Sequence, residues 1–269
     1  MSLRTRTPTA LILLTFILLS IQFLPPLGFF LFLQIGILAS LFEFYNLPRR
    51  RNVFPKKALG VLLSLIIGLS FFFEALSLEL ALFISLFLVA IYFVLTVNKL
   101  EKLPQFPASI ALTFFGAFYL SFTINFFYIL REEKGPLIVY FLLAVVTIGD
   151  TGAYLFGKLL GRHKLVPIAS PKKTWEGSFA GIVFACLGAV AVQQTLIKDF
   201  VLWKAILFAL IVHAVAQISD PLESLFKRAV GVKDSSNILP GHGGFLDRID
   251  SLILATPFFY YLVKLFGTN

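Results

Sequence analysis

The chain has 269 residues, of which 58% are hydrophobic and 14% charged, and its mean hydropathy is +0.91. A soluble domain of this length could not bury so much apolar surface, and 32 phenylalanines without regular polar alternation argue against a membrane β-barrel. The net charge of +9 favours loops facing anionic lipid headgroups and substrates over nucleic acid, so the composition predicts an all-α, polytopic membrane protein that binds no nucleic acid.

Nine apolar segments follow one another along the chain, and long runs without charge predict transmembrane helices. They cover residues 10–24, 27–47, 57–73, 77–97, 107–130, 136–157, 177–197, 200–219 and 246–266. Proline and glycine turn signals separate them, as at Pro48 and at Gly135-Pro136. The first segment could pass for a signal peptide, but it has no small-residue cleavage site and leads directly into a second span, so we count it as a helix.

The basic residues predict the orientation of these segments. If the N-terminus is cytoplasmic, eighteen of the 23 Lys and Arg residues fall on the cytoplasmic side. The positive-inside rule then places the C-terminus of a nine-span chain outside. The two longest polar loops, 158–176 and 227–248, face the cytoplasm, where nucleotides are found. We divide the chain into an N-terminal transmembrane scaffold, 1–135, offering dimer or lipid contacts, and a C-terminal catalytic region, 136–269, carrying both loops.

Acidic residues gather in the second half of the chain, at or near the predicted cytoplasmic ends of helices. They are Asp150, Glu176, Asp220, Glu223, Asp234, Asp247 and Asp250. An ionised side chain at the centre of a membrane helix costs about 2.5–3.5 kcal/mol, so such residues are candidates for function. An acid near a helix end costs less. For each of these residues, the alternative to a functional role is therefore simple exposure to water.

Asp220 ends the apolar run AILFALIVHAVAQISD and is followed by Pro221. Proline has no N–H donor, so the carbonyl of Gln217 loses its helical partner. A carboxylate beside a freed carbonyl oxygen predicts a site for a hard cation. Glu223 lies four residues before Lys227, and an i,i+4 ion pair explains it as well as a role as metal ligand does.

Asp247 and Asp250 open the last apolar segment and, three residues apart, share one helical face. Capping of the helix N-terminus could explain one of them. It does not explain the glycines just before: Gly241, Gly243 and Gly244. A Pro-Gly-His-Gly-Gly turn lets the backbone approach a ligand and offers N–H groups to an anion. With Lys227, Arg228 and Lys233 nearby, the stretch predicts a phosphate site.

The other polar loop, GRHKLVPIASPKKTWEG, residues 161–177, adds four cations: Arg162, Lys164, Lys172 and Lys173. Ser170 and Pro171 predict the N-cap and first residue of a helix. Lysines in its first turn would oppose the helix dipole, so we expect an anionic partner there, with contact to lipid phosphate as the alternative. His163 and His213 are expected to be structural.

Carboxylates for Mg²⁺, cationic loops and a glycine-rich turn are the parts that phosphoryl or nucleotidyl transfer requires. The stretch SLFKRAVGVKDSSNILPGHGGFLDRID, residues 224–250, resembles the signature of the phosphatidate cytidylyltransferase, or CDP-diacylglycerol synthase, family. Residues 149–177, GDTGAYLFGKLLGRHKLVPIASPKKTWEG, are similar to that family as well. The chain departs from the family pattern at Ser219-Asp220-Pro221, where Gly-Asp-Leu is more usual, and at Ser235-Ser236, where Ser-Gly is.

The resemblance implies that the phosphate of phosphatidate attacks the α-phosphorus of CTP, giving CDP-diacylglycerol and pyrophosphate. It implies a multi-pass homodimer in the inner, cytoplasmic membrane, with its site facing the cytoplasm. It implies Mg²⁺, with K⁺ as a second ion, held by Asp220, Asp247, Asp250 and Glu223. It implies catalytic roles for Asp220, Asp247, Lys227 and Arg228. It implies substrate binding by Lys172, Lys173, Lys233, His242, Gly243, Gly244 and Arg248.

Two alternatives differ in chemistry or class. A CTP-dependent lipid kinase of the polyprenol type would release CDP and phosphorylate a lipid alcohol. It would need a general base, for which only His242 or the acids are candidates. An anion or lipid transporter would place charges along a transmembrane path, whereas here they collect at one face, and the chain has no internal repeat of the kind transporters carry.

Overall fold

The structure is a computed structural model that describes residues 3–238, 241 and 243–268, with the backbone alone for 3–11 and 13. The chain forms two compact units. The first joins Met1–Tyr128 with Asp234–Arg248, and the second joins Ile129–Lys233 with Ile249–Asn269. The sequence-based division put all of 136–269 in one region. The structure groups Asp234–Arg248, called the signature segment below, with the first unit.

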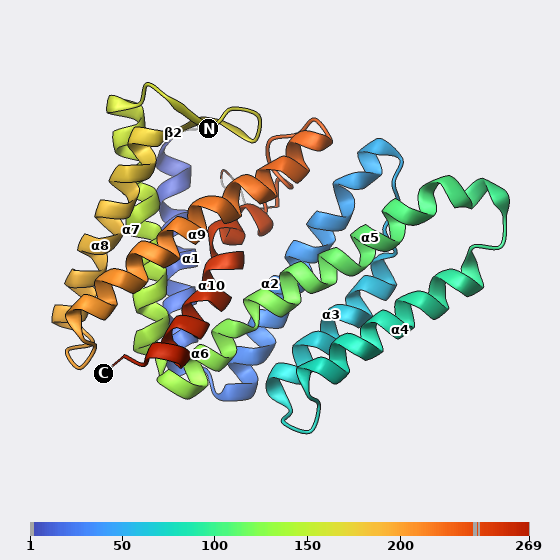
Figure 1. The fold of residues 1–269 in the computed structure, drawn as a ribbon, viewed down its shortest axis with the longest axis horizontal. Coiled ribbons are helices and arrows are strands. Elements are labelled where there is room, and N and C mark those ends of the chain that lie inside the picture. Colours follow the sequence, from blue (N-terminus) through green and yellow to red (C-terminus); the bar gives the residue numbers. More distant parts are fainter. Residues whose placement is uncertain (1–2, 239–240, 242, 269) are drawn as a thin grey trace. The chain divides into compact units, whose positions relative to one another are not determined.

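The helices follow the predicted apolar segments. They are α1 (Leu3–Phe23), α2 (Pro26–Asn46), α3 (Lys57–Phe72), α4 (Leu78–Thr96), α5 (Phe106–Ala117), α6 (Phe126–Lys134), α7 (Pro136–Leu160), α8 (Trp175–Thr195), α9 (Leu202–Ala229) and α10 (Leu246–Phe266) (Figure 1). Three short helical turns accompany them: η1 (Pro48–Arg51), η2 (Leu100–Gln105) and η3 (Phe118–Phe122). Within the described residues, seven stretches are long and apolar enough to cross a membrane, and two apolar helices, Leu14–Phe23 and Lys57–Phe72, are shorter. A helical, polytopic membrane protein is thus confirmed, and the count of nine spans stays a prediction.

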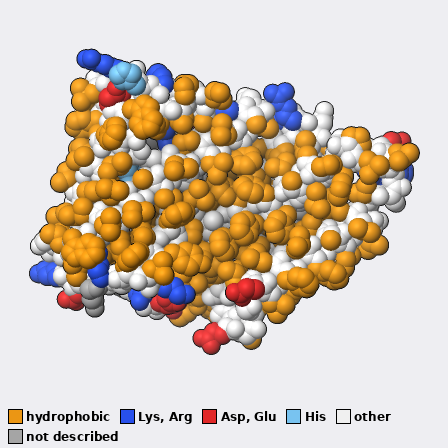
Figure 2. Space-filling model, viewed as in Figure 1, with side chains coloured by type: hydrophobic (Ala, Val, Ile, Leu, Met, Phe, Trp, Pro, Cys, Tyr) orange, Lys and Arg blue, Asp and Glu red, His pale blue; other side chains and the backbone are white. Residues whose placement is uncertain are grey.

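The exposed side chains are those expected of a helical membrane protein. Large hydrophobic residues such as Phe83, Val94, Leu155 and Phe179 are exposed on their helices. Hydrophobic side chains cover most of the face that Figure 2 shows. A water-soluble monomer rarely exposes so large an apolar surface, whereas lipid acyl chains would cover it.

The segment predicted as one helix over 107–130 is interrupted. A π-helical turn, η3, separates α5 from α6. Asn125 Nδ2 donates to the carbonyl of Ser121 at 2.7 Å, and Asn125 Oδ1 accepts from Gln34 Nε2 at 2.7 Å. Side-chain bonds of this kind compete with the helical backbone ladder, which explains a local change of pitch that apolar composition does not reveal.

The loop between α7 and α8 is a β-hairpin. Its antiparallel strands are β1 (Lys164–Val166) and β2 (Ser170–Thr174). The prediction that Ser170 and Pro171 begin a helix is therefore wrong, and Lys172 and Lys173 lie on a strand. The helix begins later, because Thr174 is the N-cap of α8 and its Oγ1 accepts from the backbone N–H of Gly177 at 3.2 Å. Proline suits β2, since a two-stranded ribbon leaves one edge of each strand unpaired.

Helix α9 is longer than the apolar run that predicted it. The run was expected to end at residue 219, but α9 continues through Pro221 to Ala229. Asp220 therefore lies inside a helix, one residue before a proline. Because proline cannot donate to the carbonyl four residues earlier, the expectation of an unpaired helical carbonyl at Gln217 is compatible with the longer helix.

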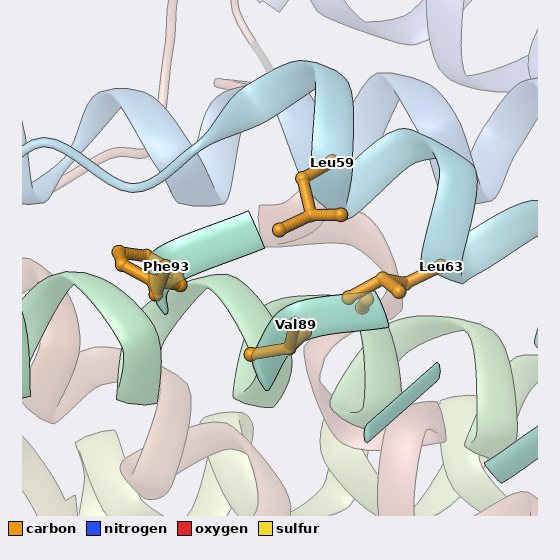
Figure 3. Close-up of a cluster of buried hydrophobic side chains, with 5 residues drawn as sticks. Leu59, Leu63, Val89 and Phe93 are labelled. Atoms are coloured by element: carbon orange, nitrogen blue, oxygen red, sulfur yellow. The ribbon is translucent and has the colours of Figure 1, made fainter. Parts of the chain in front are cut away.

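In the first unit, α3 packs against α4 and α5. Leu59 and Leu63 of α3 meet Val89 and Phe93 of α4 in a buried cluster (Figure 3). Tyr45 ties α2 to α5, since its Oη donates to the carbonyl of Thr113 at 2.5 Å. A glycine is required opposite this ring, because a Cβ at Gly116 would lie 2.6 Å from a Tyr45 ring carbon. The end of α2 is thereby held in place.

In the second unit, α8 packs against both α7 and α9 (Figure 1). Glycines allow the close approach: a Cβ at Gly152 of α7 would lie 2.5 Å from atoms of Phe184 in α8. His213 of α9 is fully buried, and a Cβ at Gly181 would lie 2.7 Å from its Nε2. Small residues that admit a neighbouring side chain are typical of membrane helix packing. The expected structural role of His213 agrees with this packing.

Candidate active site

Three aspartates from three helices of the second unit form what we call the aspartate cluster: Asp150 of α7, Asp220 of α9 and Asp250 of α10. Ser251 lies between two of them. Its Oγ donates to Asp150 Oδ2 at 3.0 Å and lies 3.4 Å from Asp250 Oδ1. The backbone N–H of Ser251 also donates to Asp250 Oδ1, at 2.7 Å. One hydroxyl thus links the carboxylates of α7 and α10.

Asp220 joins the cluster to the hairpin. Lys173 Nζ of β2 lies 2.9 Å from Asp220 Oδ2, with 26% and 27% of the two side chains exposed. Ser224, one helical turn later, donates from Oγ to Asp220 Oδ1 at 3.3 Å. The anionic partner expected for the loop lysines is therefore present for Lys173, although through a strand and not a helix terminus.

Ser219 gives a physical meaning to one departure from the family pattern. Its Oγ donates to the backbone carbonyl of Asp250 and accepts from the backbone N–H of Leu254 at 3.2 Å. A glycine at this position could make neither bond. The hydroxyl therefore ties α9 to α10 at the level of the aspartates.

Glu223 and Lys227 form the ion pair that their spacing allowed, and both side chains are buried. Breaking a buried pair by removing one partner leaves an uncompensated charge, so this pair is important to the folded unit. Arg228 binds backbone carbonyls. Its Nη1 donates to Val232 at 2.7 Å and its Nε to Ala169 at 3.3 Å. The guanidinium thereby fixes the hairpin to the end of α9.

The signature segment of the first unit is organised around two carboxylates. Asp247 Oδ2 accepts from Ser235 N and Gly244 N, each at 2.9 Å, and lies 2.9 Å from Ser235 Oγ. Glu43, near the end of α2, accepts from the hydroxyls of Ser235 and Ser236 and from two backbone N–H groups of the segment. Sequence reasoning missed Glu43. Its only signal was an acid inside the apolar run 27–47.

Two glycines of the turn have left-handed backbone conformations. Gly241 and Gly243 have φ of +78° and +79°, which favour glycine. A Cβ at Gly244 would collide with Glu43 Oε2 and Ser235 Oγ. The backbone N–H groups from Gly244 to Leu246 bind the chain's own carboxylates, whereas we expected the turn to offer them to a substrate anion.

The side chains of Lys172, Lys233 and Arg248 are exposed. His242 lies outside the described residues. Their predicted roles in substrate binding stay predictions.

The donor chemistry of the aspartate cluster fits Mg²⁺, which takes carboxylate and other oxygen ligands. Throughout the part of the chain that the structure describes, no three His, Cys, Asp or Glu side chains gather so as to hold a metal ion by themselves. Proteins commonly hold Mg²⁺ with one or two carboxylates, while substrate phosphates and water complete the shell. The cluster therefore suits a cation that arrives with a nucleotide.

Comparison with known proteins identifies relatives of the chain. Residues 4–266 match the Cytidylyltransferase family. Proteins named phosphatidate cytidylyltransferase from Staphylococcus epidermidis and Staphylococcus aureus are 39% identical to the chain over 171 residues, and one from Staphylococcus haemolyticus is 39% identical over 173. Each match covers 64% of this chain and 64% of the relative, just under two thirds of its length.

Proposed function

Because the chain belongs to the cytidylyltransferase family, we propose that it transfers the cytidylyl group of CTP to phosphatidate, giving CDP-diacylglycerol and pyrophosphate. The names of the similar staphylococcal proteins support this choice of lipid substrate. The observation that carries the proposal is the Lys173–Asp220 ion pair beside Asp150 and Asp250. It combines carboxylates for a divalent cation with a cation for phosphate in one unit.

The residues of the cluster have distinct roles in this reaction. Lys173 is partly exposed, so it can exchange its bond to Asp220 for one to a phosphate oxygen of the incoming substrate. Asp220 and Asp250 would hold the cation, and Asp150, which shares the Ser251 hydroxyl with Asp250, would support Asp250. Mg²⁺, when bound, would neutralise charge on the triphosphate and on the departing pyrophosphate. Asp247, Lys172 and Lys233 keep the roles that the resemblance implies.

The attacking group of phosphatidate is already an anion, so the reaction needs no strong general base. The chain's task is to orient two highly charged substrates and offset their repulsion. The basic side chains predicted for this task, Lys173, Lys227 and Arg228, differ in the structure. Lys173 is partly exposed, whereas Lys227 is buried against Glu223 and Arg228 is bound to carbonyls. Lys173 is therefore our first choice for contact with phosphate, and the other two support the fold around it.

The orientation and assembly belong to the proposal as well. The N-terminus lies in the cytoplasm and the C-terminus outside, so that both polar loops face the nucleotide pool. The distribution of Lys and Arg supports this orientation. The bacterial relatives support the cell membrane as its location. The homodimer and the second ion, K⁺, rest on the resemblance alone.

The test uses the purified chain in phospholipid vesicles with CTP, Mg²⁺ and phosphatidate. We expect pyrophosphate and CDP-diacylglycerol in equal amounts, and none when diacylglycerol replaces phosphatidate. Asp220→Asn should reduce turnover at least about tenfold, as loss of a metal-site group commonly does. Asp199→Asn, at an exposed acid between α8 and α9, is the matched control and should leave turnover unchanged. Release of CDP with a phosphorylated lipid alcohol would instead establish a lipid kinase.

A further inference from the structure

Glu43 is a buried acid in a helix that sequence reasoning assigned to the scaffold. Only 2% of the surface of Glu43 is exposed. Oε1 accepts from Ser236 Oγ at 2.7 Å and from Phe245 N at 3.1 Å. Oε2 accepts from Ser235 Oγ at 2.8 Å and from Leu246 N at 2.9 Å. All four donors belong to the signature segment.

Burial of a carboxylate is unfavourable unless hydrogen bonds replace its hydration. Here each oxygen receives two donors. Two of them are backbone N–H groups at the beginning of α10, where a negative charge also interacts favourably with the helix dipole. Glu43 therefore fixes the first turn of the helix that carries Asp247.

Ser235 couples the two carboxylates. Its Oγ lies 2.8 Å from Glu43 Oε2 and 2.9 Å from Asp247 Oδ2, although a hydroxyl has only one proton to donate. Gly244 lies against the same groups, with no room for a side chain beside Glu43 Oε2 and Ser235 Oγ. Ser235 and Gly244 thus set the position of the Asp247 carboxylate. Glu43 contacts Ser235 and leaves no room for a side chain at Gly244.

We propose that Glu43 is a positioning residue that holds the signature segment in the shape that Asp247 needs for the transfer reaction. The inference deepens the proposed function and rests on it. Glu43 itself is bonded to the protein on both oxygens, so it acts through Asp247 and the backbone of the turn, not through substrate.

The test compares Glu43→Gln with Gln34→Met. The amide cannot accept on its nitrogen, so two of the four donors lose their acceptor and the charge at the helix terminus disappears. Gln34 is a matched control because it is buried on the same helix and bonds Asn125, away from the signature segment. We measure kcat with CTP and phosphatidate, and hydrogen–deuterium exchange of peptides from residues 234–248 and 57–72.

Glu43→Gln should lower kcat about tenfold or more, as loss of an outer-shell partner does. It should speed exchange at least about fivefold in 234–248 while leaving 57–72 unchanged, since local opening is confined to the released segment. Gln34→Met should change neither kcat nor exchange in 234–248 by more than about twofold. Ser236→Ala, which removes one donor to Glu43, should act in the same direction and to a smaller extent. It replaces Glu43→Gln if that variant does not fold.

Unchanged exchange in 234–248, unchanged kcat, or equal losses of kcat in Glu43→Gln and Gln34→Met would each overturn the positioning role. Failure of the proposed function has a different signature, since the wild-type chain would then make no CDP-lipid. The exchange measurement would still report whether Glu43 holds the segment.

Discussion

Asp150 and Asp250 share the hydroxyl of one serine, and Asp220 pairs with Lys173 in the same unit. Neighbouring carboxylates repel one another unless a cation or a proton offsets their charge. Lys173 supplies one positive charge, at Asp220. An added divalent cation would supply more, which supports our proposal of a metal-dependent reaction.

Asp150→Asn tests this reading at a residue that the sequence flagged as an acid but did not place in the site. We expect turnover to fall at least about tenfold and half-maximal activity to require more Mg²⁺, because Asp250 loses a charged neighbour that binds the same serine. The measurement is a titration of activity with Mg²⁺ in vesicles. Thr151→Val, at an exposed neighbour whose Oγ1 bonds only within α7, is the control. Normal turnover and normal Mg²⁺ dependence in Asp150→Asn would remove this residue from the site.

At the scale of helices, the close packing of α7, α8 and α9 depends on missing side chains. A Cβ at Gly181 would lie 2.7 Å from His213 Nε2 and 2.9 Å from the Ala153 Cβ. Neither neighbour can retreat easily, since His213 is fully buried. The three helices would have to separate to accept even a methyl group.

Gly181→Ala should therefore destabilise the second unit by about 1–3 kcal/mol, the usual cost of overpacking. Thermal unfolding in detergent, followed by the fraction that stays monodisperse, measures the change. Gly36→Ala in α2 is the control, because no atom of the described residues lies within 4 Å of the added Cβ. It should be neutral or slightly stabilising, since alanine favours a helix. Equal midpoints for the two variants would show that the packing at Gly181 is looser than described.

The positions of the helices were predictable because apolar runs and proline signals are local properties of the sequence. The hairpin was not, since Ser170-Pro171 suits both a helix start and an edge strand. The ion pair of Glu223 and Lys227 followed from helical spacing. The bond between Glu43 and Ser235 could not be predicted, because it joins residues 192 positions apart and no local pattern encodes such a contact.

At the scale of the whole chain, the number of spans decides which side each terminus occupies. Nine spans and seven spans are both odd, so either count places the termini on opposite sides of the membrane. If one of the two shorter helices, Leu14–Phe23 or Lys57–Phe72, crossed the membrane and the other did not, the number of spans would be even. Both termini would then lie on the same side of the membrane. The distribution of Lys and Arg supports our proposal that the N-terminus lies in the cytoplasm.

A reporter fused to the C-terminus should therefore be active outside the cytoplasm. The measurement uses two C-terminal fusions, one to an enzyme that is active only outside the cytoplasm and one to an enzyme that is active only inside it. Each fusion serves as the control for expression of the other. Activity of the inside reporter at the C-terminus would contradict the proposed topology and would place an even number of spans in the membrane.

The central claim is that the α-phosphorus of CTP enters the lipid. It is tested most directly with two preparations of CTP, one labelled at the α-phosphorus and one at the γ-phosphorus, each given to the purified chain with Mg²⁺, phosphatidate and a lipid alcohol such as diacylglycerol. Cytidylyl transfer predicts label in the lipid only from the α-labelled nucleotide, and label in pyrophosphate from the γ-labelled one. Label in the lipid from the γ-phosphorus would contradict the claim and identify a CTP-dependent kinase.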